Sequence, residues 1–435
     1  MTRAGASAIV KHRLRNGLEV RLKPVHTAPL VSSWLWYRVG SRNERTGQTG
    51  VSHWVEHMQF KGTPAFPSGV LDKAISRDGG LWNAGTWIDW TTYYEIMPAD
   101  RIDLALRLEA DRMANSNFDP AEVESERTVI ISERQGHENN PSFRLAEEVQ
   151  AAAFRVHSYH HEVIGDMADL EAMSRDDLYG YYQTHYTPSN AVLALAGDFK
   201  PGPMLKRIRE LFGSIPRSPQ PDTSVRTEPE QPGERRVAVE GPDPTPIVEV
   251  AYRVPSAKDP DFVPLTVMDS VLAGASSLSP FGGGLPNKTS RLYRALVHGG
   301  LAAAVSGGLA ATIDPYLYSL RATVRPDRSP DAVLDRLDEE VDRLLQEAVA
   351  PEEVEKAIKQ AKAIFAYDSE SITHQGMWLG YAEMFADYAW FETFLDRISR
   401  VSPEDVLKVA HKYLRPSNRV AGIYRPSTEG SHVGS

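Results

Sequence analysis

The second half of this 435-residue chain repeats the first half at a nearly constant distance. The segment Phe118–Glu124 (FDPAEVE) returns as Val349–Glu355 (VAPEEVE), 231 positions later. The segment Ser174–Asn190 returns as Ser402–Asn418, 228 positions later, and both copies end in Pro-Ser-Asn. This period is far above the roughly 20–50 residues of repeat arrays, so it predicts two homologous domains and not a solenoid.

A stretch rich in proline and polar residues separates the two halves. Five prolines fall between positions 216 and 232, and this composition is typical of a linker. We therefore expect an N-terminal domain at 1–215, a linker at 216–235 and a C-terminal domain at 236–435. Within the last of these, residues from about 426 to 435 are expected to form a disordered tail.

The order of strand-like and helix-like patterns favours an α+β fold. Val31–Val39 is rich in aromatic and β-branched residues, and Ala191–Gly197 is a continuous apolar run typical of a buried strand, so both segments predict strands. Helical patterns cover Asp100–Ser116, Pro120–His137 and Arg144–Val156. Because the strands are grouped apart from the helical pairs, we expect each domain to contain a mostly antiparallel or mixed sheet with helices packed on one side.

The composition excludes several kinds of site and partner. There is no cysteine, so any metal must be held by histidine and carboxylate side chains. The formal net charge of −10 argues against a nucleic-acid partner. The sequence has no run of about 18 apolar residues, which predicts no membrane span. The N-terminal residues lack a signal-peptide pattern, so we expect a cytoplasmic protein, or a periplasmic one if a signal was removed before this numbering.

The segment Gly50–Thr63 contains the pattern H-x-x-E-H, formed by His53, Glu56 and His57. Positions i and i+4 of a helix lie on one face, so the two imidazoles can converge on one metal ion. This order of residues is the inverzincin signature, in which Glu56 would take a proton from water and pass it to the leaving amine. The alternative is a pair of ordinary histidines on a polar helix face or in the core.

A catalytic zinc needs a third protein ligand, for which the predicted helix Pro120–His137 offers Glu122, Glu124, Glu126 and Glu133. Glu126 and Glu133 are seven residues apart and therefore share a face. Glu133 lies in the apolar run TVIISE, where an unpaired carboxylate would be costly. The second half keeps the helix but has Ala357 and Ile364 at these two positions, so the fold does not require the carboxylates. For Glu122 and Glu124 we favour a solvent-exposed helix face.

Several segments together resemble the pitrilysin/insulinase superfamily of zinc peptidases: GSRNERTGQTGVSHWVEHMQFKGT, GGLWNAGTWIDWTTYYE, ERTVIISE, HYTPSNAVLALAGDF and TSRLYRAL. The chain is most similar to the short two-domain branch typified by the catalytic (beta) subunit of mitochondrial processing peptidase. This resemblance implies a zinc metalloendopeptidase, with one Zn²⁺ per chain.

The resemblance also assigns the site residues. His53, His57 and Glu133 would be the zinc ligands, since Glu133 follows His57 by 76 residues, which is the family's spacing. Glu56 would be the catalytic base, and Glu126 matches a glutamate that supports the site in the family. The second half has no H-x-x-E-H, so one site per chain is expected.

The segment Gly79–Glu95 can form an exposed edge strand, to which an extended peptide can add by main-chain hydrogen bonds. In the family, an Asn-Ala pair at this edge contacts the substrate backbone, and the matching pair here is Asn83 and Ala84. From the residues alone, an asparagine that satisfies its own backbone is an equal alternative for Asn83.

The chain departs from the family in its C-terminal half. Self-sufficient members carry there an arginine and a tyrosine, seven residues apart, that bind substrate and stabilise the oxyanion. The matching segment Ala295–Val305 has Val297 at the arginine position and Ala303 or Ala304 at the tyrosine position. We therefore expect a homologous partner subunit that carries the Arg/Tyr pair and completes a chamber for peptide substrates.

Two alternatives stay open. One is a non-catalytic core subunit with the same fold, which the intact H-x-x-E-H argues against. The other is a self-sufficient homodimer in which Arg291 or Tyr293 reaches the site, although structural roles are expected for both residues.

Overall fold

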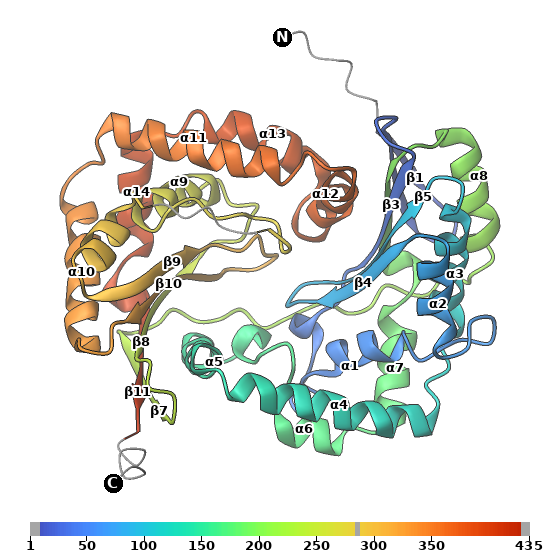
Figure 1. Cartoon of the computed structure of the whole chain (residues 1–435), viewed down its shortest axis with the longest axis horizontal. Coiled ribbons are helices and arrows are strands. Elements are labelled where there is room, and N and C mark those ends of the chain that lie inside the picture. The colour runs from blue at the N-terminus through green and yellow to red at the C-terminus, as the bar shows by residue number, and fades with distance from the viewer. Residues whose placement is uncertain (1–8, 283–287, 428–435) are drawn as a thin grey trace. The chain divides into compact units, whose positions relative to one another are not determined.

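The computed structural model describes residues 9–282 and 288–427, which form two compact units built on one β-sheet each (Figure 1). The first unit contains the described residues of Met1–Arg134, His161–Val225 and Ser369–Tyr388. The second unit contains those of Gln135–His160, Arg226–Asp368 and Ala389–Ser435. Neither unit is therefore a continuous piece of the chain.

The sheet of the first unit has six strands in the order β1-β2-β6-β3-β5-β4. Its strands are β1 (Val10–Arg13), β2 (Glu19–Pro24), β3 (Leu30–Tyr37), β4 (Leu81–Thr86), β5 (Thr91–Pro98) and β6 (Ala191–Gly197). β2 and β6 are parallel, and the other neighbours are antiparallel. The sheet is therefore mixed, and β4 lies at its edge.

The sheet of the second unit repeats this topology, with the order β7-β11-β8-β10-β9. Its strands are β7 (Arg235–Gly241), β8 (Ile247–Val254), β9 (Ala302–Gly308), β10 (Tyr316–Val324) and β11 (Arg419–Pro426). Here too, only the pair equivalent to β2 and β6, namely β7 and β11, is parallel. The α+β class with mixed sheets is confirmed, and the shared strand order is what a duplication predicts.

The repeated segments also have the same local structure. Ser174 begins α7 (Arg175–His185) with a capping box in which its side chain and that of Asp177 bond each other's backbone N–H. Ser402 and Asp405 do the same at the start of α14 (Pro403–Tyr413). The sequence repeat therefore preserves how a helix starts as well as where it lies.

The described part of the first unit contains seven further α-helices, and the two of them that the sequence predicts at Asp100–Ser116 and Pro120–His137 begin and end within a few residues of those bounds. They are α1 (Val51–Met58), α2 (Val70–Arg77), α3 (Ile102–Asn115), α4 (Pro120–Glu138, whose last turn belongs to the second unit), α6 (Met167–Ala172), α8 (Pro201–Phe212) and α12 (Ile372–Phe385). The second unit contains α5 (Pro141–Ala153), α9 (Phe262–Leu272), α10 (Pro330–Gln346), α11 (Pro351–Tyr367), α14 and nearly all of α13 (Tyr388–Ile398).

Each sheet is contacted by one helix from the other half of the sequence. In the first unit, α12 packs on β3 and β6, and in the second unit α5 packs on β11, β7 and β8. The two helices begin 231 residues apart, at Pro141 and Ile372, and are therefore equivalent in the repeat. The predicted boundaries 1–215, 216–235 and 236–435 divide the sequence repeat. They stay predictions, because each compact unit combines segments from both halves of the chain.

Between the end of α8 and the start of β7, residues 216–234 have no helix or strand. Of the expected tail, residues 428–435 lie outside the described residues, while Pro426 ends β11. Among the described residues, no helix combines the length and the apolar character that crossing a lipid bilayer requires.

The contact between β3 and α12 is close because glycines of α12 face tryptophans of β3. A Cβ on Gly376 would meet Ser32 and Trp34, each at 3.0 Å, and a Cβ on Gly380 would overlap the indole of Trp36. β3 is buried from Val31 to Tyr37, as expected of a strand that is covered on both faces. This packing fixes the strand that is central to the first sheet.

We expect Gly380→Ala to destabilise the protein by about 1–3 kcal/mol, because the added methyl group overpacks the contact with Trp36. The matched control is Gly180→Ala in α7, where a Cβ would meet nothing within 4 Å. Helix propensity predicts that this control stabilises the protein by roughly 0.5–1 kcal/mol. Chemical denaturation measures both changes, and equal effects of the two substitutions would contradict the packing account.

Candidate metal centre

The H-x-x-E-H motif lies on α1, a helix of eight residues. Trp54, Val55 and Met58 anchor this helix in the core, since all three are fully buried. His53 and His57 are half-buried on the same side, with their ring centroids 4.6 Å apart. The helical period therefore brings the two imidazoles together, as the motif predicts.

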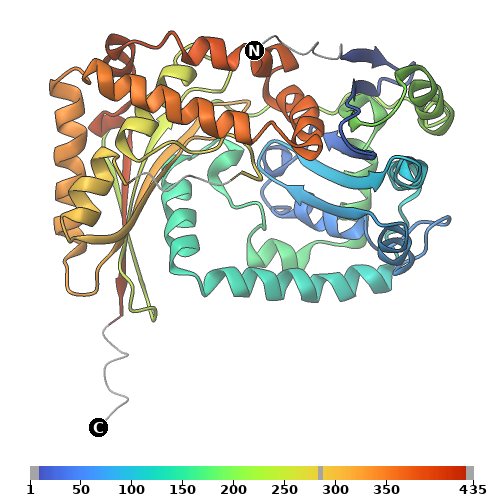
Figure 2. The same ribbon diagram turned by 45° about the horizontal axis from the view of Figure 1, so that its top comes forward.

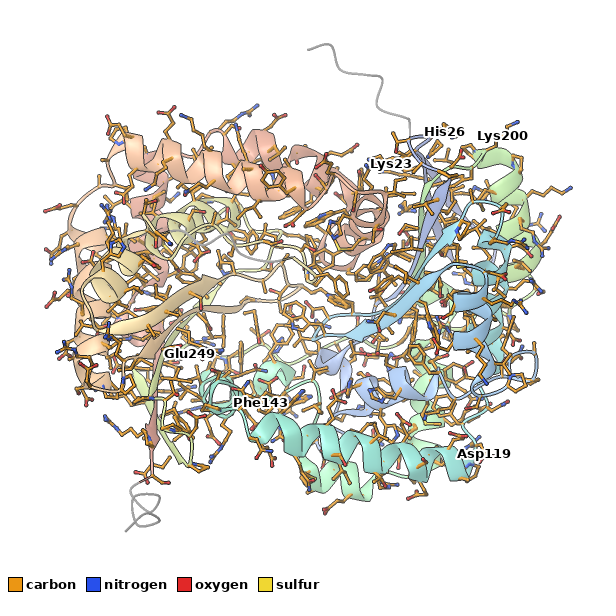
Figure 3. All side chains as sticks on the ribbon, in the orientation of Figure 1. Lys23, His26, Asp119, Phe143, Lys200 and Glu249 are labelled. Atoms are coloured by element: carbon orange, nitrogen blue, oxygen red, sulfur yellow. The ribbon has the colours of Figure 1, made fainter. Side chains whose placement is uncertain are left out.

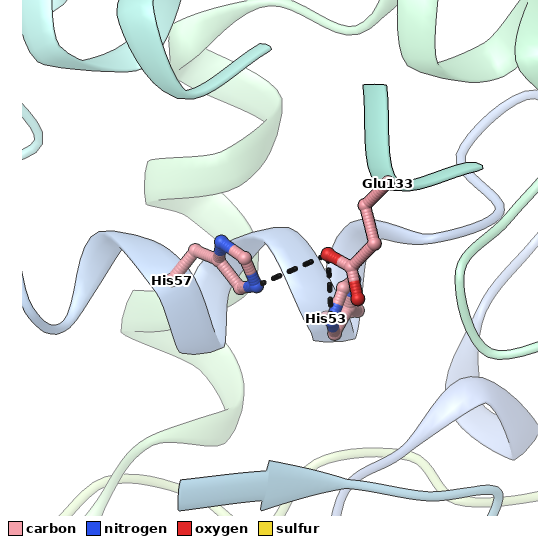
Figure 4. Close-up of side chains that lie close together, drawn as sticks. All are labelled: His53, His57 and Glu133. Atoms are coloured by element: carbon pink, nitrogen blue, oxygen red, sulfur yellow. Dashed lines mark ion pairs between the residues drawn. The ribbon is translucent and has the colours of Figure 1, made fainter. Parts of the chain in front are cut away.

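The carboxylate that joins them comes from α4, which runs beside α1 in both views (Figures 1 and 2). Glu133 Oε2 lies 3.8 Å from His57 Nε2 and 4.0 Å from His53 Nε2 (Figure 4). One possible ligand atom from each of the three residues lies within 4.8 Å of the others. Within the described ranges, this is the only group of three or more such side chains that could hold a metal ion.

The three side chains fit a zinc ion in the type and number of their donors. Two imidazole nitrogens and one carboxylate oxygen form a known catalytic zinc set that leaves one position open. Zinc bonds of about 2.0–2.2 Å place tetrahedral ligand atoms roughly 3.4 Å apart, so the two distances to Glu133 would each close by about 0.4–0.6 Å and no pair by more than about 1.4 Å. Such a change is within the reach of side-chain rotation.

Glu126 orients one of the imidazoles. Its Oε1 accepts a hydrogen bond of 2.8 Å from His57 Nδ1, which leaves His57 Nε2 directed at Glu133. The other oxygen of Glu126 forms an ion pair with Lys61. The sequence predicted a supporting role for Glu126, but it gave no signal for Lys61.

The same contacts shift two pKa values. Burial opposes protonation of His57, but the hydrogen bond to Glu126 and the surrounding carboxylates outweigh it and raise its pKa. Burial of Glu126 acts in the opposite direction to its hydrogen bonds with His57 and Lys61, which lower the pKa of this carboxyl group. Glu126 is therefore held as a carboxylate, the form that accepts a hydrogen bond from the ring.

Glu56 lies on the same helix as the histidines and is 8% exposed. Burial raises the pKa of its carboxyl group, and a hydrogen bond of 2.7 Å from Thr86 Oγ1 to Oε2 partly offsets this. Sequence reasoning did not single out Thr86. The signal was present, since Thr86 belongs to the expected edge strand and follows Ala84 by two residues, on the same face.

The expected edge strand is β4, which pairs only with β5 and contacts α1. Leu81 at its start is 68% exposed. Asn83 Oδ1 accepts a hydrogen bond of 2.9 Å from the backbone N–H of Ala84. Asn83 therefore satisfies a neighbouring backbone group, as one of the two sequence interpretations predicts.

The glutamates of α4 have different environments. α4 begins after Asp119, whose side chain accepts a hydrogen bond from the N–H of Ala121 (Figure 3). Glu124 is exposed and pairs with Arg127 at 3.0 Å, which confirms the expected solvated face. The side chain of Glu133 is 36% exposed and lies close to both histidines, so this carboxylate within the apolar run TVIISE is neither fully buried nor isolated.

Comparison with known proteins agrees with this architecture. Residues 20–167 match the family model described as insulinase (peptidase family M16), and residues 172–361 match the one described as peptidase M16 inactive domain. The chain belongs to peptidase family M16. The part that matches the insulinase model contains the whole His53, His57 and Glu133 group.

Relatives of this M16 chain are named as proteases. The zinc protease PqqE of Helicobacter pylori is 27% identical over 439 residues, covering 97% of this chain and 94% of its own. The beta subunit of the mitochondrial-processing peptidase of Lentinula edodes is 26% identical over 414 residues, covering 92% and 86%. The crystal structure of a protease from Helicobacter pylori has a TM-score of 0.91 at 25% identity, covering 97% and 100%. These names support a zinc cofactor and a peptidase class.

We expect Glu126→Gln to weaken zinc binding about 10–100-fold without abolishing it, because His57 loses the carboxylate that orients its ring. Competition with a chromophoric chelator measures this affinity. Glu124→Gln is the matched control on the same helix, since Glu124 is exposed and faces Arg127. Equal zinc affinities of the two variants would contradict the orienting role of Glu126.

Proposed function

We propose that this chain is the zinc-binding, catalytic subunit of an endopeptidase that hydrolyses extended peptides. The observation that carries the proposal is the convergence of His53, His57 and Glu133 within 4.8 Å, with Glu56 on the same helix as both histidines. The three converging residues would hold the metal and Glu56 would perform the proton transfers. The zinc proteases among the relatives support the same reaction class.

A bound zinc ion supplies Lewis-acid chemistry, because it makes water more acidic and polarises a peptide carbonyl. The chain's own residues then manage the proton. Thr86 holds Oε2 of Glu56, so Oε1 is the atom that accepts a proton from water and later delivers it to the leaving amine.

The edge of β4 is the proposed site for the peptide backbone. An extended peptide can add to this edge, because β4 pairs with β5 on one side only. Asn83 and Ala84 would meet the peptide near the bond to be cut, while Thr86 keeps Glu56 beside the same strand. Main-chain recognition suits an enzyme that accepts peptides of different sequence.

We also propose that a homologous partner subunit supplies an arginine and a tyrosine that this chain lacks. At the matching positions the chain has Val297 and, on β9, the exposed methyl side chains of Ala303 and Ala304. Arg291 is engaged by Glu353 of α11 through hydrogen bonds of 3.1 and 2.8 Å. An arginine held in this way supports the structural role expected for it.

The first test is metal content combined with two variants. We expect one zinc ion per wild-type chain and a large loss of zinc in Glu133→Ala. Glu56→Gln should keep its zinc yet lose at least about 100-fold in kcat, because only the proton acceptor is removed. Elemental analysis and a peptide-cleavage assay measure these quantities. A zinc-free wild type, or a Glu56→Gln variant with normal turnover, would contradict the proposal.

The second test concerns the partner. We expect the purified chain alone to cleave an unstructured peptide at least 100-fold more slowly than a mixture with a homologue that carries the Arg/Tyr pair, since oxyanion donors contribute about 10²–10³ in rate. The control is the same homologue with both residues replaced. Full activity of the chain alone would instead indicate a self-sufficient enzyme, and size-exclusion chromatography would then show whether it is a homodimer.

A further inference from the structure

The N-terminus of α1 is held by a residue outside the helix. The N-cap residue is Gly50, at φ 87°, which has no side chain to accept hydrogen bonds from the first turn. Glu44 takes over this function. Its Oε2 accepts a hydrogen bond from the N–H of Gly50 and its Oε1 accepts one from the N–H of Ser52, both at 2.8 Å.

Glu44 is in turn held by a histidine that lies more than a hundred residues later in the sequence. His161 Nε2 lies 2.8 Å from Glu44 Oε2, and the two side chains are 3% and 0% exposed. A buried carboxylate is costly unless it is paired and hydrogen-bonded. The helix N-terminus and the imidazole together meet this requirement. Burial lowers the pKa of His161, but the hydrogen bond to Glu44 and the negative charges near the imidazole outweigh burial and raise it.

The backbone around this pair has little freedom to shift. A Cβ on Gly50 would meet the carbonyl oxygen of Ile164 at 2.5 Å and the Cα of Gly165 at 3.0 Å. Thr49 donates two hydrogen bonds to Asp169 Oδ2, of 2.9 Å from its N–H and 2.7 Å from its hydroxyl group. The segment that contains His161 therefore packs directly against the start of α1.

We propose that Glu44 and His161 are positioning residues of the metal centre, which set the axial position and rotation of α1 so that His53 and His57 face Glu133. The inference rests on the proposed zinc site and concerns how that site is preformed. Side-chain rotation can bring the ligand atoms to zinc bond lengths, which in a formed site lie within about 0.2 Å of their standard values, only if α1 presents both imidazoles at a defined axial position and rotation. A short helix with a glycine N-cap cannot supply this accuracy alone, and the fixed N–H groups of Gly50 and Ser52 lie directly before His53.

The test uses the full chain, with zinc affinity from chelator competition and the visible spectrum of the cobalt(II)-substituted protein as readouts. We expect Glu44→Gln to weaken zinc binding about 10–100-fold and to change the cobalt spectrum. The amide has only one oxygen, so it can accept only one of the two backbone hydrogen bonds that Glu44 accepts. His161→Ala should weaken binding in the same direction. His161→Gln should restore affinity to within about threefold of wild type, because its side-chain N–H can still donate to Glu44.

The matched control is Asp405→Asn, which weakens a cap on α14 and should leave zinc affinity and the cobalt spectrum unchanged. Hydrogen exchange of the metal-free proteins gives a readout without zinc, and α1 should exchange faster in Glu44→Gln and His161→Ala only. If Glu44→Gln does not fold, the comparison of His161→Ala with His161→Gln decides.

The outcomes separate this inference from the proposed function. A wild type that binds zinc, together with variants of unchanged affinity and spectrum, would overturn the positioning role alone. A wild type that binds no zinc would overturn the proposed function and this inference with it.

Discussion

The hydrogen bond between His57 and Glu126 joins the two helices that carry the three side chains able to hold a metal ion, and the geometry of the site depends on it. His57 belongs to α1 and Glu126 to α4, which also carries Glu133 two turns later. With Nδ1 engaged at 2.8 Å, only Nε2 is left for a metal. Without this bond, the ring could rotate and the 3.8 Å approach to Glu133 would not be maintained.

The site concentrates negative charge in a small volume. Glu56, Glu126 and Glu133 gather around two imidazoles, while Lys61 pairs with Glu126 from one side. Each of these three carboxylates has a different environment. Glu133 keeps a partly exposed side chain, Glu126 is held as a carboxylate by two hydrogen-bonding partners, and burial raises the pKa of Glu56. A divalent cation would offset the remaining charge, which suits a binding site better than a structural salt bridge.

The duplicated fold shows that the scaffold does not require this chemistry. Apart from the additional edge strand β1 in the first unit, both sheets have the same strand order and the same single parallel pair, and α11 is the counterpart of α4 in the repeat. Yet α11 has Ala357 and Ile364 where α4 has Glu126 and Glu133, and both replacements are buried. The equivalent helix therefore packs with apolar side chains in one unit and contributes a carboxylate to the candidate metal centre in the other, so the scaffold alone does not specify the site.

The sequence alone determined the features that depend on short-range periodicity. The i and i+4 spacing placed His53 and His57 on one side of a helix, and the apolar run Ala191–Gly197 marked the strand β6. The spacing from His57 to Glu133 added the third ligand through a family resemblance. The positions of the helix and of the strand depend on interactions between residues that are close together in the chain, so they can be predicted from the order of the residues alone.

Only the tertiary structure decided which distant segments meet. It placed α12 on the first sheet and α5 on the second, so that the compact units interleave along the chain. It also brought Thr86 to Glu56, Lys61 to Glu126 and His161 to Glu44. The strand period placed Thr86 on the face of Ala84, but no periodic signature pairs any of these residues with its partner, because the pairing depends on how whole elements pack and on which buried charges then need a partner.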